Sequence, residues 1–405
     1  MCPIDPGCTW GVLSSPGFTD IRPTAAPAGA RGRRRGDTAE CGILPDMEFD
    51  LFYELAVPDP DVRGEAQMFQ EMLDQLCVAE NCGFRTVWLV EHHFMRGYSH
   101  SSAPDLVLAA ASQRTQRLRL GHAIVPLPYH HPVIVAERLA TLDILSGGRV
   151  EFGFGRGFSP QEYDAFGVAM NESRERVAES LEVLRGYFRG GPLSHSGRLY
   201  PFKELDIVPS VVQRPHPPLW MAAVSPESFD LAAQLGVGVL AGPFKPWFMV
   251  RTDIERYRAS LAQESAGKAQ GDGINRRVGM TVGLLCLEDG RRARAMAKAN
   301  VTRFYRELLR RTAPVLEKLH ASYEYYRRIG GLRFLLEKAA SLAVLETAGM
   351  VVAGDPDHCI RKLEEFSAGG VDHLLCAIGA GGSPHEVVVE SMHTIAKYLI
   401  PHFQR

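Results

Sequence analysis

An α/β barrel of eight parallel strands, each followed by a helix, is the fold class that this sequence predicts. From Met47 onward, short apolar runs of strand length alternate with longer segments whose apolar residues recur at helical spacing. About eight strands occur in this alternation, and such a pattern implies parallel strands joined by right-handed crossovers. Eight strand–helix units close into a TIM (β/α)8 barrel with its active site at the carboxyl ends of the strands. A doubly wound open sheet is the alternative.

Four strand–helix units are expected in the first half of the pattern. Pro132 suits the first turn of the third helix, because proline lacks the N–H that this turn leaves unpaired. The expected strands are 48–54, 86–90, 118–127 and 150–155. The expected helices are 65–83, 103–115, 132–147 and 173–188.

The second half repeats the alternation and adds an insertion. After the seventh strand an irregular helical segment, Arg310 to Leu345, interrupts the pattern. The expected strands are 219–224, 237–241, 277–288 and 373–377. The expected helices are 226–236, 249–260, 290–305, 356–370 and 383–399.

Composition places the chain among ordinary globular proteins and excludes several functions. Of its 405 residues, 45% are hydrophobic and 23% are charged, and the net charge is -2. That charge creates no global field toward nucleic acid or a membrane, and no apolar run approaches the roughly 20 residues of a membrane span. The 8 cysteines form no C-x-x-C pair, which favours free thiols in a reducing, cytoplasmic environment.

The first 46 residues differ from the rest, and we expect two parts: an extension, 1–46, and a barrel domain, 47–405. The extension is rich in Gly, Pro, Ala and Arg, lacks a periodic apolar pattern and is expected to be disordered. Its basic stretch GARGRRRGDT, from Gly29 to Thr38, is either a solvated tail or an anion contact. One hypothesis is that Met47 is the true start, which the intact mass of the natively expressed protein would test.

The second expected strand ends abruptly in Glu91, His92 and His93. Side chains alternate along an extended chain, so His92 points one way while Glu91 and His93 point the other. A catalytic imidazole is favoured, because histidine titrates near neutrality. The alternatives are histidines bonded to nearby backbone, or a metal site, which the sequence does not favour. A metal site would have to recruit one of four further histidines: His100, His122, His130 and His131.

Three other strand ends carry candidate binding groups. Arg156, between Gly155 and Gly157, can fork onto a phosphate, although it is alternatively a surface arginine beside a flexible turn. Ser225 is placed as an N-cap, and Ser225 and Ser228 flank free N–H groups at a helix start, where an anion binds unless they only cap the helix. Ala123 is small enough for a flat ring to approach the backbone, or serves packing at the barrel centre.

Together these residues resemble the bacterial luciferase family, the luciferase-like flavin-dependent monooxygenases. The resemblance runs from about Met47 to Phe403. The most specific stretches are NCGFRTVWLVEHHF, LPYHHPVIVAERLATLDILSGGRVEFGFGRGF and FGVAMNESRER. AAVSPESFDLAAQLG and VVAGDPDHCIRKLEEFSAGGVDHLLC are weaker matches.

The resemblance implies an oxygenase that takes reduced FMN from a separate flavin reductase and, through a C4a-peroxyflavin formed with O2, oxidises a small organic substrate. A homodimer is typical of such relatives. The matching positions imply His92 as the catalytic histidine, with Glu91 and His93 beside it. Cofactor-binding roles fall on Arg156 and Gly157, on the hydroxyls of Ser225 and Ser228, and on Ala123 and Ile124, whose peptide bond is often cis in the family.

Two departures narrow this expectation. Luciferase alpha chains carry a cysteine and a tyrosine where this chain has Gly155 and Ser159. The insertion, which in the family forms a mobile lid, also has a different amino-acid sequence in this chain. We therefore expect a monooxygenase that is not a luciferase. The alternatives are an oxidoreductase that uses the deazaflavin F420, a flavin-binding subunit without activity, and a metal-dependent barrel hydrolase.

Overall fold

The structure is a computed structural model that describes residues 46–264, 273–320 and 341–404, with side chains described in the second range only to residue 312. The expected disordered extension, 1–46, lies outside the described residues except for its last residue. Residues 321–340 of the expected insertion also lie outside them.

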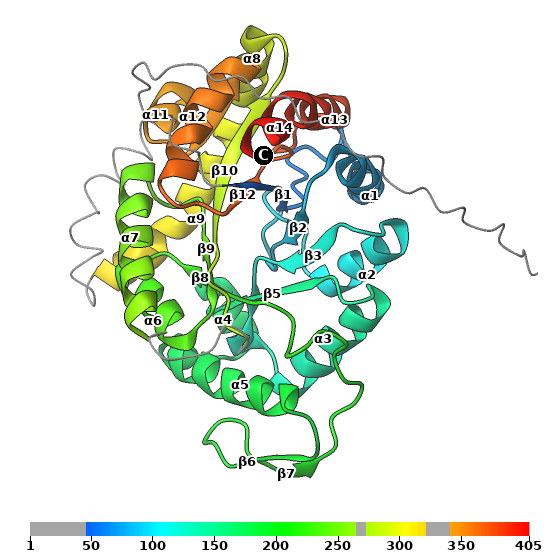
Figure 1. Cartoon of the computed structure of the whole chain (residues 1–405), viewed down its shortest axis with the longest axis vertical. Coiled ribbons are helices and arrows are strands. Elements are labelled where there is room, and N and C mark those ends of the chain that lie inside the picture. Colours follow the sequence, from blue (N-terminus) through cyan, green and yellow to red (C-terminus); the bar gives the residue numbers. More distant parts are fainter. Residues whose placement is uncertain (1–45, 265–272, 321–340, 405) are drawn as a thin grey trace, which may run out of the picture. The chain divides into compact units, whose positions relative to one another are not determined.

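Eight parallel strands close into a barrel, as predicted, and the open-sheet alternative is wrong (Figure 1). The closure is made by the last strand, which pairs with the first in the register Glu48↔His373 and Leu51↔Cys376. The barrel strands, in order around it, are β1 (Glu48–Tyr53), β2 (Thr86–Leu89), β3 (Arg119–His122), β5 (Val150–Gly155), β8 (Leu219–Ala223), β9 (Gly238–Ala241), β10 (Val278–Cys286) and β12 (His373–Cys376).

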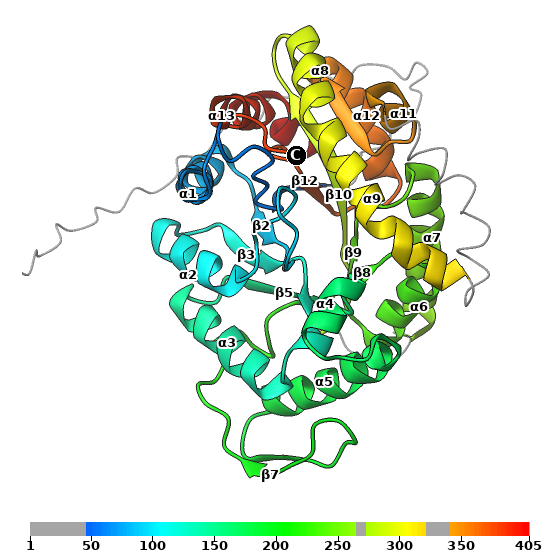
Figure 2. The ribbon, with the colours of Figure 1, turned by 180° about the vertical axis from the view of Figure 1, so that it is seen from behind.

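Helices surround the barrel in both views (Figures 1 and 2). They form where apolar residues recur at helical spacing, as in the first, whose buried side chains include Met68, Met72, Leu76 and Ala79. The surrounding helices are α1 (Glu65–Cys82), α2 (Pro104–Arg114), α3 (Pro132–Leu145), α5 (Ser173–Phe188), α6 (Pro226–Leu235), α7 (Trp247–Glu264), α8 (Gly290–Ala299), α12 (Pro356–Ala368) and α13 (His385–Thr394).

Several local features differ from the predicted pattern. The long third strand stops at His122, and a short β4 (Val125–Pro126) then pairs with the end of β5. The expected helix 290–305 is divided at Asn300 into α8 and α9 (Val301–His320). The last helix continues through a π-helical turn, Ile395–Leu399, into α14 (Ile400–Phe403).

Five elements were not predicted. β11 (Val351–Gly354) pairs with the second half of β10, outside the closed ring. The others are α4 (Pro160–Ala165), the antiparallel hairpin of β6 (Leu193–His195) and β7 (Phe202–Leu205), and α11 (Leu342–Thr347). The hairpin extends away from the barrel (Figure 1). These segments are short, so the apolar periodicity that reveals a helix or strand has little length in which to appear.

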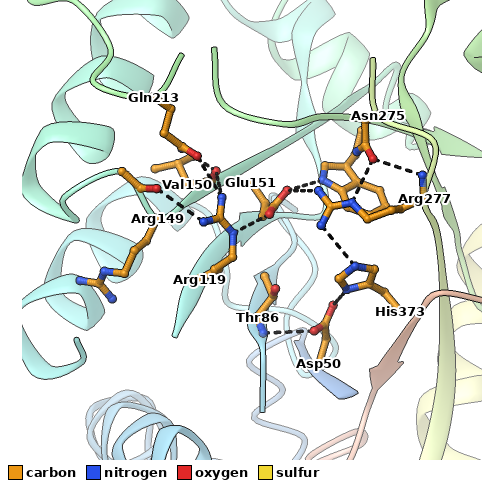
Figure 3. Close-up of polar contacts among 12 residues, drawn as sticks. Asp50, Thr86, Arg119, Arg149, Val150, Glu151, Gln213, Asn275, Arg277 and His373 are labelled. Atoms are coloured by element: carbon orange, nitrogen blue, oxygen red, sulfur yellow. Dashed lines mark hydrogen bonds and ion pairs between the residues drawn. The ribbon is translucent and has the colours of Figure 1, made fainter. Parts of the chain in front are cut away.

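Buried carboxylates occupy the amino-terminal end of the barrel (Figure 3). Asp50, with no exposed surface, accepts hydrogen bonds from the backbone N–H of Thr86 at 3.1 Å and from the indole of Trp88 at 2.8 Å. The same carboxylate lies 2.9 Å from Nδ1 of His373. A buried carboxylate is tolerated when its oxygens are all partnered in this way.

Glu151, the second residue of β5, has the same function on the other side of the barrel (Figure 3). It accepts from Nε of Arg119 at 2.5 Å and from the indole of Trp220 at 2.6 Å, and it lies 3.3 Å from Arg277. The guanidinium of Arg277 also lies 4.8 Å from the Trp220 ring centre. These charges are satisfied by one another, so this end of the barrel has a structural role.

None of the helices in the described part of the chain is long and apolar enough to cross a membrane.

Candidate active site

A cavity of about 500 Å³ lies at the carboxyl ends of the barrel strands. Its size falls within the range of small-molecule and cofactor sites. Helices α4 and α9 lie over the strands in Figure 2, and Leu308, Leu309 and Thr312 of α9 line the cavity. Eight of the nine predicted site residues line it as well: Glu91, His92, Ala123, Ile124, Arg156, Gly157, Ser225 and Ser228.

His93 is the predicted site residue that does not line the cavity. Its Nε2 lies 3.1 Å from Oε1 of Glu91, and its ring packs edge-on against Phe166 at 4.9 Å. His93 therefore lies on the opposite side of the loop from His92, as expected. The expectation is wrong for Glu91, which lines the cavity with His92, because β2 ends at Leu89 and strand alternation does not continue through these residues. His93 supports the loop after β2 through these contacts.

Glu91 is buried between two imidazoles. Its Oε1 lies 3.1 Å from His93 and 2.6 Å from Nε2 of His130. Burial acts to raise the pKa of this carboxyl, but the hydrogen bonds and charges of the two histidines outweigh it and hold the pKa below its ordinary value. Glu91 is thus an ionised partner for the histidines.

His92 lies between two buried carboxylates, neither of which was predicted. Its Nδ1 is 3.6 Å from Oε1 of Glu162, and its Nε2 is 3.8 Å from Oε2 of Glu54. Both distances exceed a direct hydrogen bond. Burial alone would lower the pKa of His92, but the charges of Glu54 and Glu162 raise it above its ordinary value. Phe158 packs edge-on against the imidazole at 5.2 Å.

The two carboxylates differ in how they are held. Glu54 directly follows β1 and accepts a hydrogen bond from the hydroxyl of Tyr98 at 3.0 Å. Glu162, on α4, accepts from the backbone N–H of His93 at 2.8 Å and from the hydroxyl of Tyr129 at 3.0 Å. Glu54 ends an apolar strand, the signal that revealed Glu91, and could have been found in the same way. Glu162 lies on a helix with no comparable signal.

Arg156 stands at the edge of the cavity, immediately after β5. The next residue, Gly157, has φ +72°, and a Cβ there would lie 2.6 Å from the Tyr129 hydroxyl, so the turn requires glycine. Arg156 is exposed, and within 46–264, 273–312 and 341–404 its guanidinium forms no ion pair. This guanidinium is therefore placed to meet an anion from solution.

The start of α6 lies on the cavity wall, with Ser225 as N-cap and Pro226 as first helical residue, as predicted. The Ser228 hydroxyl accepts from the backbone N–H groups of Val224 and Ser225, each at 3.0 Å, and donates to the Ser225 carbonyl at 2.6 Å. The proton of this hydroxyl is thus used within the turn. What the helix start offers to an anion is its N–H groups and its dipole.

A wall of small residues lines the cavity between β3 and β8. The peptide bond Ala123–Ile124 is cis. A Cβ at Gly155 would lie 2.9 Å from Cδ1 of Ile124 and 3.3 Å from Cβ of Ala222, so a larger residue there, such as the cysteine of luciferase alpha chains, would require the Ile124 side chain to shift. The wall is consequently low enough for a flat ring to lie close to the backbone.

The histidines considered as metal ligands lie in separate contacts. His122 bonds Asp105 at 2.8 Å, His100 lies 3.1 Å from Glu65, and His130 bonds Glu91. In the part of the chain that the structure describes, no three His, Cys, Asp or Glu side chains are arranged to hold a metal ion.

The sequence model of the luciferase-like monooxygenase family matches residues 47–373 of this chain. The chain belongs to the luciferase-like monooxygenase family. An uncharacterised protein y4wF of Sinorhizobium fredii is 31% identical over 88% of this chain and 98% of its own. Limonene 1,2-monooxygenase of Rhodococcus erythropolis is 29% identical over 85% and 83%. The oxygenase component of the flavin-dependent trigonelline monooxygenase of Acinetobacter baylyi is 30% identical over 49% and 54%.

Solved structures share the barrel of this luciferase-like protein. The monooxygenase RslO1 of Streptomyces bottropensis superposes with a TM-score of 0.73 and 27% identity, covering 88% of this chain and all of its own. Two others show the fold alone. The oxygenating constituent of a Pseudomonas putida diketocamphane monooxygenase, in complex with FMN, has a TM-score of 0.69, 18% identity and coverage of 88% and 98%. The F420-dependent tetrahydromethanopterin reductase of Methanopyrus kandleri has a TM-score of 0.62 and 21% identity, and the match covers 89% of this chain and 100% of that chain.

Proposed function

We propose that this protein is a monooxygenase that uses reduced FMN and O2 to oxidise a small organic substrate. The observation that carries the proposal is that one cavity joins His92, the low wall at Ala123–Ile124 and the exposed guanidinium of Arg156. Bound reduced FMN would supply the activation of dioxygen. The chain's own residues bind, orient and protonate.

The residues fit a flavin phosphate at one end of the cavity. Arg156 offers a guanidinium, and the helix start at Ser225 and Ser228 offers N–H groups and a favourable dipole. Gly157 allows the turn that carries Arg156. The low wall formed by Ala123 and Ile124 suits a flat tricyclic ring. Anchoring by the phosphate would fix the position of the ring without contacts to its reactive edge.

His92 holds or moves a proton beside the bound molecules. It lines the cavity, and its raised pKa favours the protonated imidazole near neutral pH. Glu91 and His93 hold the loop on which His92 sits. The remaining lining is largely apolar and would limit the water around a bound ring, through residues that include Phe158, Met170, Met221, Leu240, Phe244 and Leu308.

We also propose that a separate flavin reductase supplies the reduced cofactor. The names of two similar proteins support this: one is an oxygenase component and the other an oxygenating constituent. Hydride transfer with F420 is the second candidate, because the fold of an F420-dependent reductase also covers this chain. The two candidates differ in whether dioxygen is consumed.

The test is an oxygen-electrode assay with the full chain. A generic flavin reductase with NADH supplies reduced FMN, and a panel of terpenes, cyclic ketones and N-heteroaromatic compounds is screened for substrate-dependent, monooxygenated product. In parallel, chemically reduced F420 is offered with the same panel under nitrogen. The proposal expects oxygenated product with FMN and none with F420. Turnover of F420 without oxygen, and no product with FMN, would reverse the assignment.

We further propose a homodimer formed through α2 and α3. Four large apolar side chains on these adjacent helices are strongly exposed: Leu106 at 74%, Ile134 at 45%, Ile144 at 45% and Leu145 at 47%. The exposed face of α3 is mixed: it carries these isoleucines and Leu145 beside the polar residues Glu137, Arg138 and Thr141. A second copy of the chain is the occupant that these exposed side chains favour.

A further inference from the structure

A buried carboxylate oxygen at the floor of the cavity has no hydrogen-bond partner. It is Oε2 of Glu54, which follows β1 and is 7% exposed. Its other oxygen is satisfied by the Tyr98 hydroxyl at 3.0 Å. An unpaired buried carboxylate oxygen costs free energy, and Glu54 lines the cavity, so an ionic partner for this oxygen would lower that cost.

The imidazole of His92 is an ionisable group that faces this oxygen. Nε2 of His92 lies 3.8 Å from Oε2 of Glu54, and Nδ1, which also lacks a hydrogen-bond partner, faces Glu162 at 3.6 Å. The ring is thus held between a carboxylate from β1 and one from α4. Glu162 is already committed to the His93 N–H and the Tyr129 hydroxyl. Oε2 of Glu54 faces His92. Burial raises the pKa of Glu54 above its ordinary value, although the charge of His92 and the hydrogen bonds of Tyr98 and Ser99 act to lower it.

We propose that Glu54 is a positioning residue for His92: its carboxylate stabilises the imidazolium and keeps the ring turned between β1 and α4. This inference rests on the proposed function for its catalytic meaning, since His92 is the proton-carrying group there. In this arrangement Glu54 acts through His92. Loss of the Glu54 charge would reduce the fraction of His92 that is protonated when the cofactor and substrate are bound.

Other charged groups around His92 are accounted for. Glu91 lies on the same loop, with its charge shared by His93 and His130. Tyr98 donates to Glu54, and Arg311 on α9 lies 5.4 Å from the Tyr98 ring centre. Burial raises the pKa of Tyr98, so its hydroxyl stays protonated. Among these groups, Glu54 and Glu162 are the carboxylates that face the imidazole nitrogens.

The experiment is a pH titration of His92 in the full-length protein without flavin, in which NMR of histidine labelled at carbon ε1 monitors the protonation of His92. The His92 signal is assigned by its loss in His92→Gln. Opposite charge within about 4–6 Å shifts a pKa by one to three units. We therefore expect the His92 midpoint in Glu54→Gln to fall by about one unit or more from its wild-type value. Glu54→Asp, which keeps the charge, should titrate closer to wild type than Glu54→Gln.

Glu65→Gln is the matched control, because Glu65 pairs with a different histidine, His100, at 3.1 Å. It should leave the His92 midpoint in place. Circular dichroism checks that each variant is folded. If Glu54→Gln does not fold, Glu54→Asp replaces it: the shorter side chain withdraws the carboxylate from His92, so the His92 midpoint should fall below its wild-type value, and an unchanged midpoint overturns the inference. An unchanged His92 midpoint in folded Glu54→Gln overturns the inference. The titration needs no flavin, so it separates failure of this inference from failure of the monooxygenase proposal.

Discussion

Arg156 illustrates how the function depends on single residues. The guanidinium lies at the cavity edge, and the following residue must be glycine, because Gly157 has φ +72° and a Cβ there would clash with the Tyr129 hydroxyl. The carbonyl of Arg156 accepts a hydrogen bond from the Tyr163 hydroxyl, which fixes the backbone while the side chain extends outward. The turn is therefore rigid in the backbone and open at the charged group.

Arg156→Ala should weaken binding of FMN by about tenfold, which corresponds to about 1.4 kcal/mol. A charge-assisted hydrogen bond to phosphate is worth about 1.5–3 kcal/mol when desolvated, and Arg156 is exposed, so the lower end applies. Fluorescence titration of FMN measures the effect. Arg292→Ala, which removes an exposed arginine paired with Glu390 on another part of the barrel, is the control. Equal affinity in wild type and Arg156→Ala would remove Arg156 from the phosphate site.

Helix α1 is attached to the loop that leads into β3 by one carboxylate, that of Glu80. Oε2 of Glu80 accepts backbone hydrogen bonds from Gln116 at 2.8 Å, Arg117 at 2.5 Å and Leu118 at 2.8 Å, in the segment that leads into β3. Burial acts to raise the pKa of Glu80, but these N–H donors outweigh it and lower the pKa below its ordinary value. The element pair is thus held together by an ionised side chain.

Glu80→Gln should reduce the free energy of unfolding by about 1 kcal/mol at pH 7, because a neutral amide oxygen accepts these hydrogen bonds less strongly. The folded-state pKa of Glu80 is lowered, so its stabilisation is present above the unfolded-state pKa, about 4.3, and is lost as pH falls through the folded-state value. Urea unfolding of wild type and Glu80→Gln, measured at pH 7 and at about pH 3, compares the stability with Glu80 ionised and with Glu80 increasingly protonated.

Asp74→Asn is the control for this pair, since Asp74 forms an exposed ion pair with Arg114. Its effect should stay below about 0.5 kcal/mol at both pH values. If the difference in unfolding free energy between Glu80→Gln and wild type is as large near pH 3 as at pH 7, the stabilisation does not come from ionised Glu80.

The barrel has two opposite ends, and on its outside α2 and α3 carry four exposed apolar side chains. Paired charges such as Asp50 and Glu151 fill the amino-terminal end of the barrel, and the cavity lies at the carboxyl end. Neither end needs a partner for closure. The exposed apolar side chains of α2 and α3 lie on the outer ring of helices, so a second copy can cover them without blocking the cavity.

Light scattering of the purified full-length chain should therefore give the mass of two chains. Ile134→Glu places a charge within the proposed interface and should shift the protein to the mass of one chain, because a buried unpaired charge is costly. Val62→Glu, at a side chain that is 79% exposed outside α2 and α3, should leave the dimer intact. A single-chain mass for the wild type would end the dimer proposal.

Reasoning from sequence reached furthest where a side chain's position follows from its place on a strand. Glu91, His92 and Arg156 were placed at strand ends, and the barrel brings all three to one cavity. The same reasoning expected His93 on the other side of the loop, and the structure places it outside the cavity. Glu54 was missed although it directly follows β1, the same strand-end signal that revealed Glu91.

The alternation of barrel strands with helices and the strand-end residues were determined by the sequence itself, because apolar periodicity and chain direction act over neighbouring residues. The closure of the barrel, for which the sequence left an open sheet as the alternative, was decided by the pairing of β12 with β1. Only the tertiary structure decided that Glu162 on α4 and Glu54 after β1 face the same imidazole, although 108 positions separate them. Such a meeting depends on how distant segments pack, and local patterns carry no information about it.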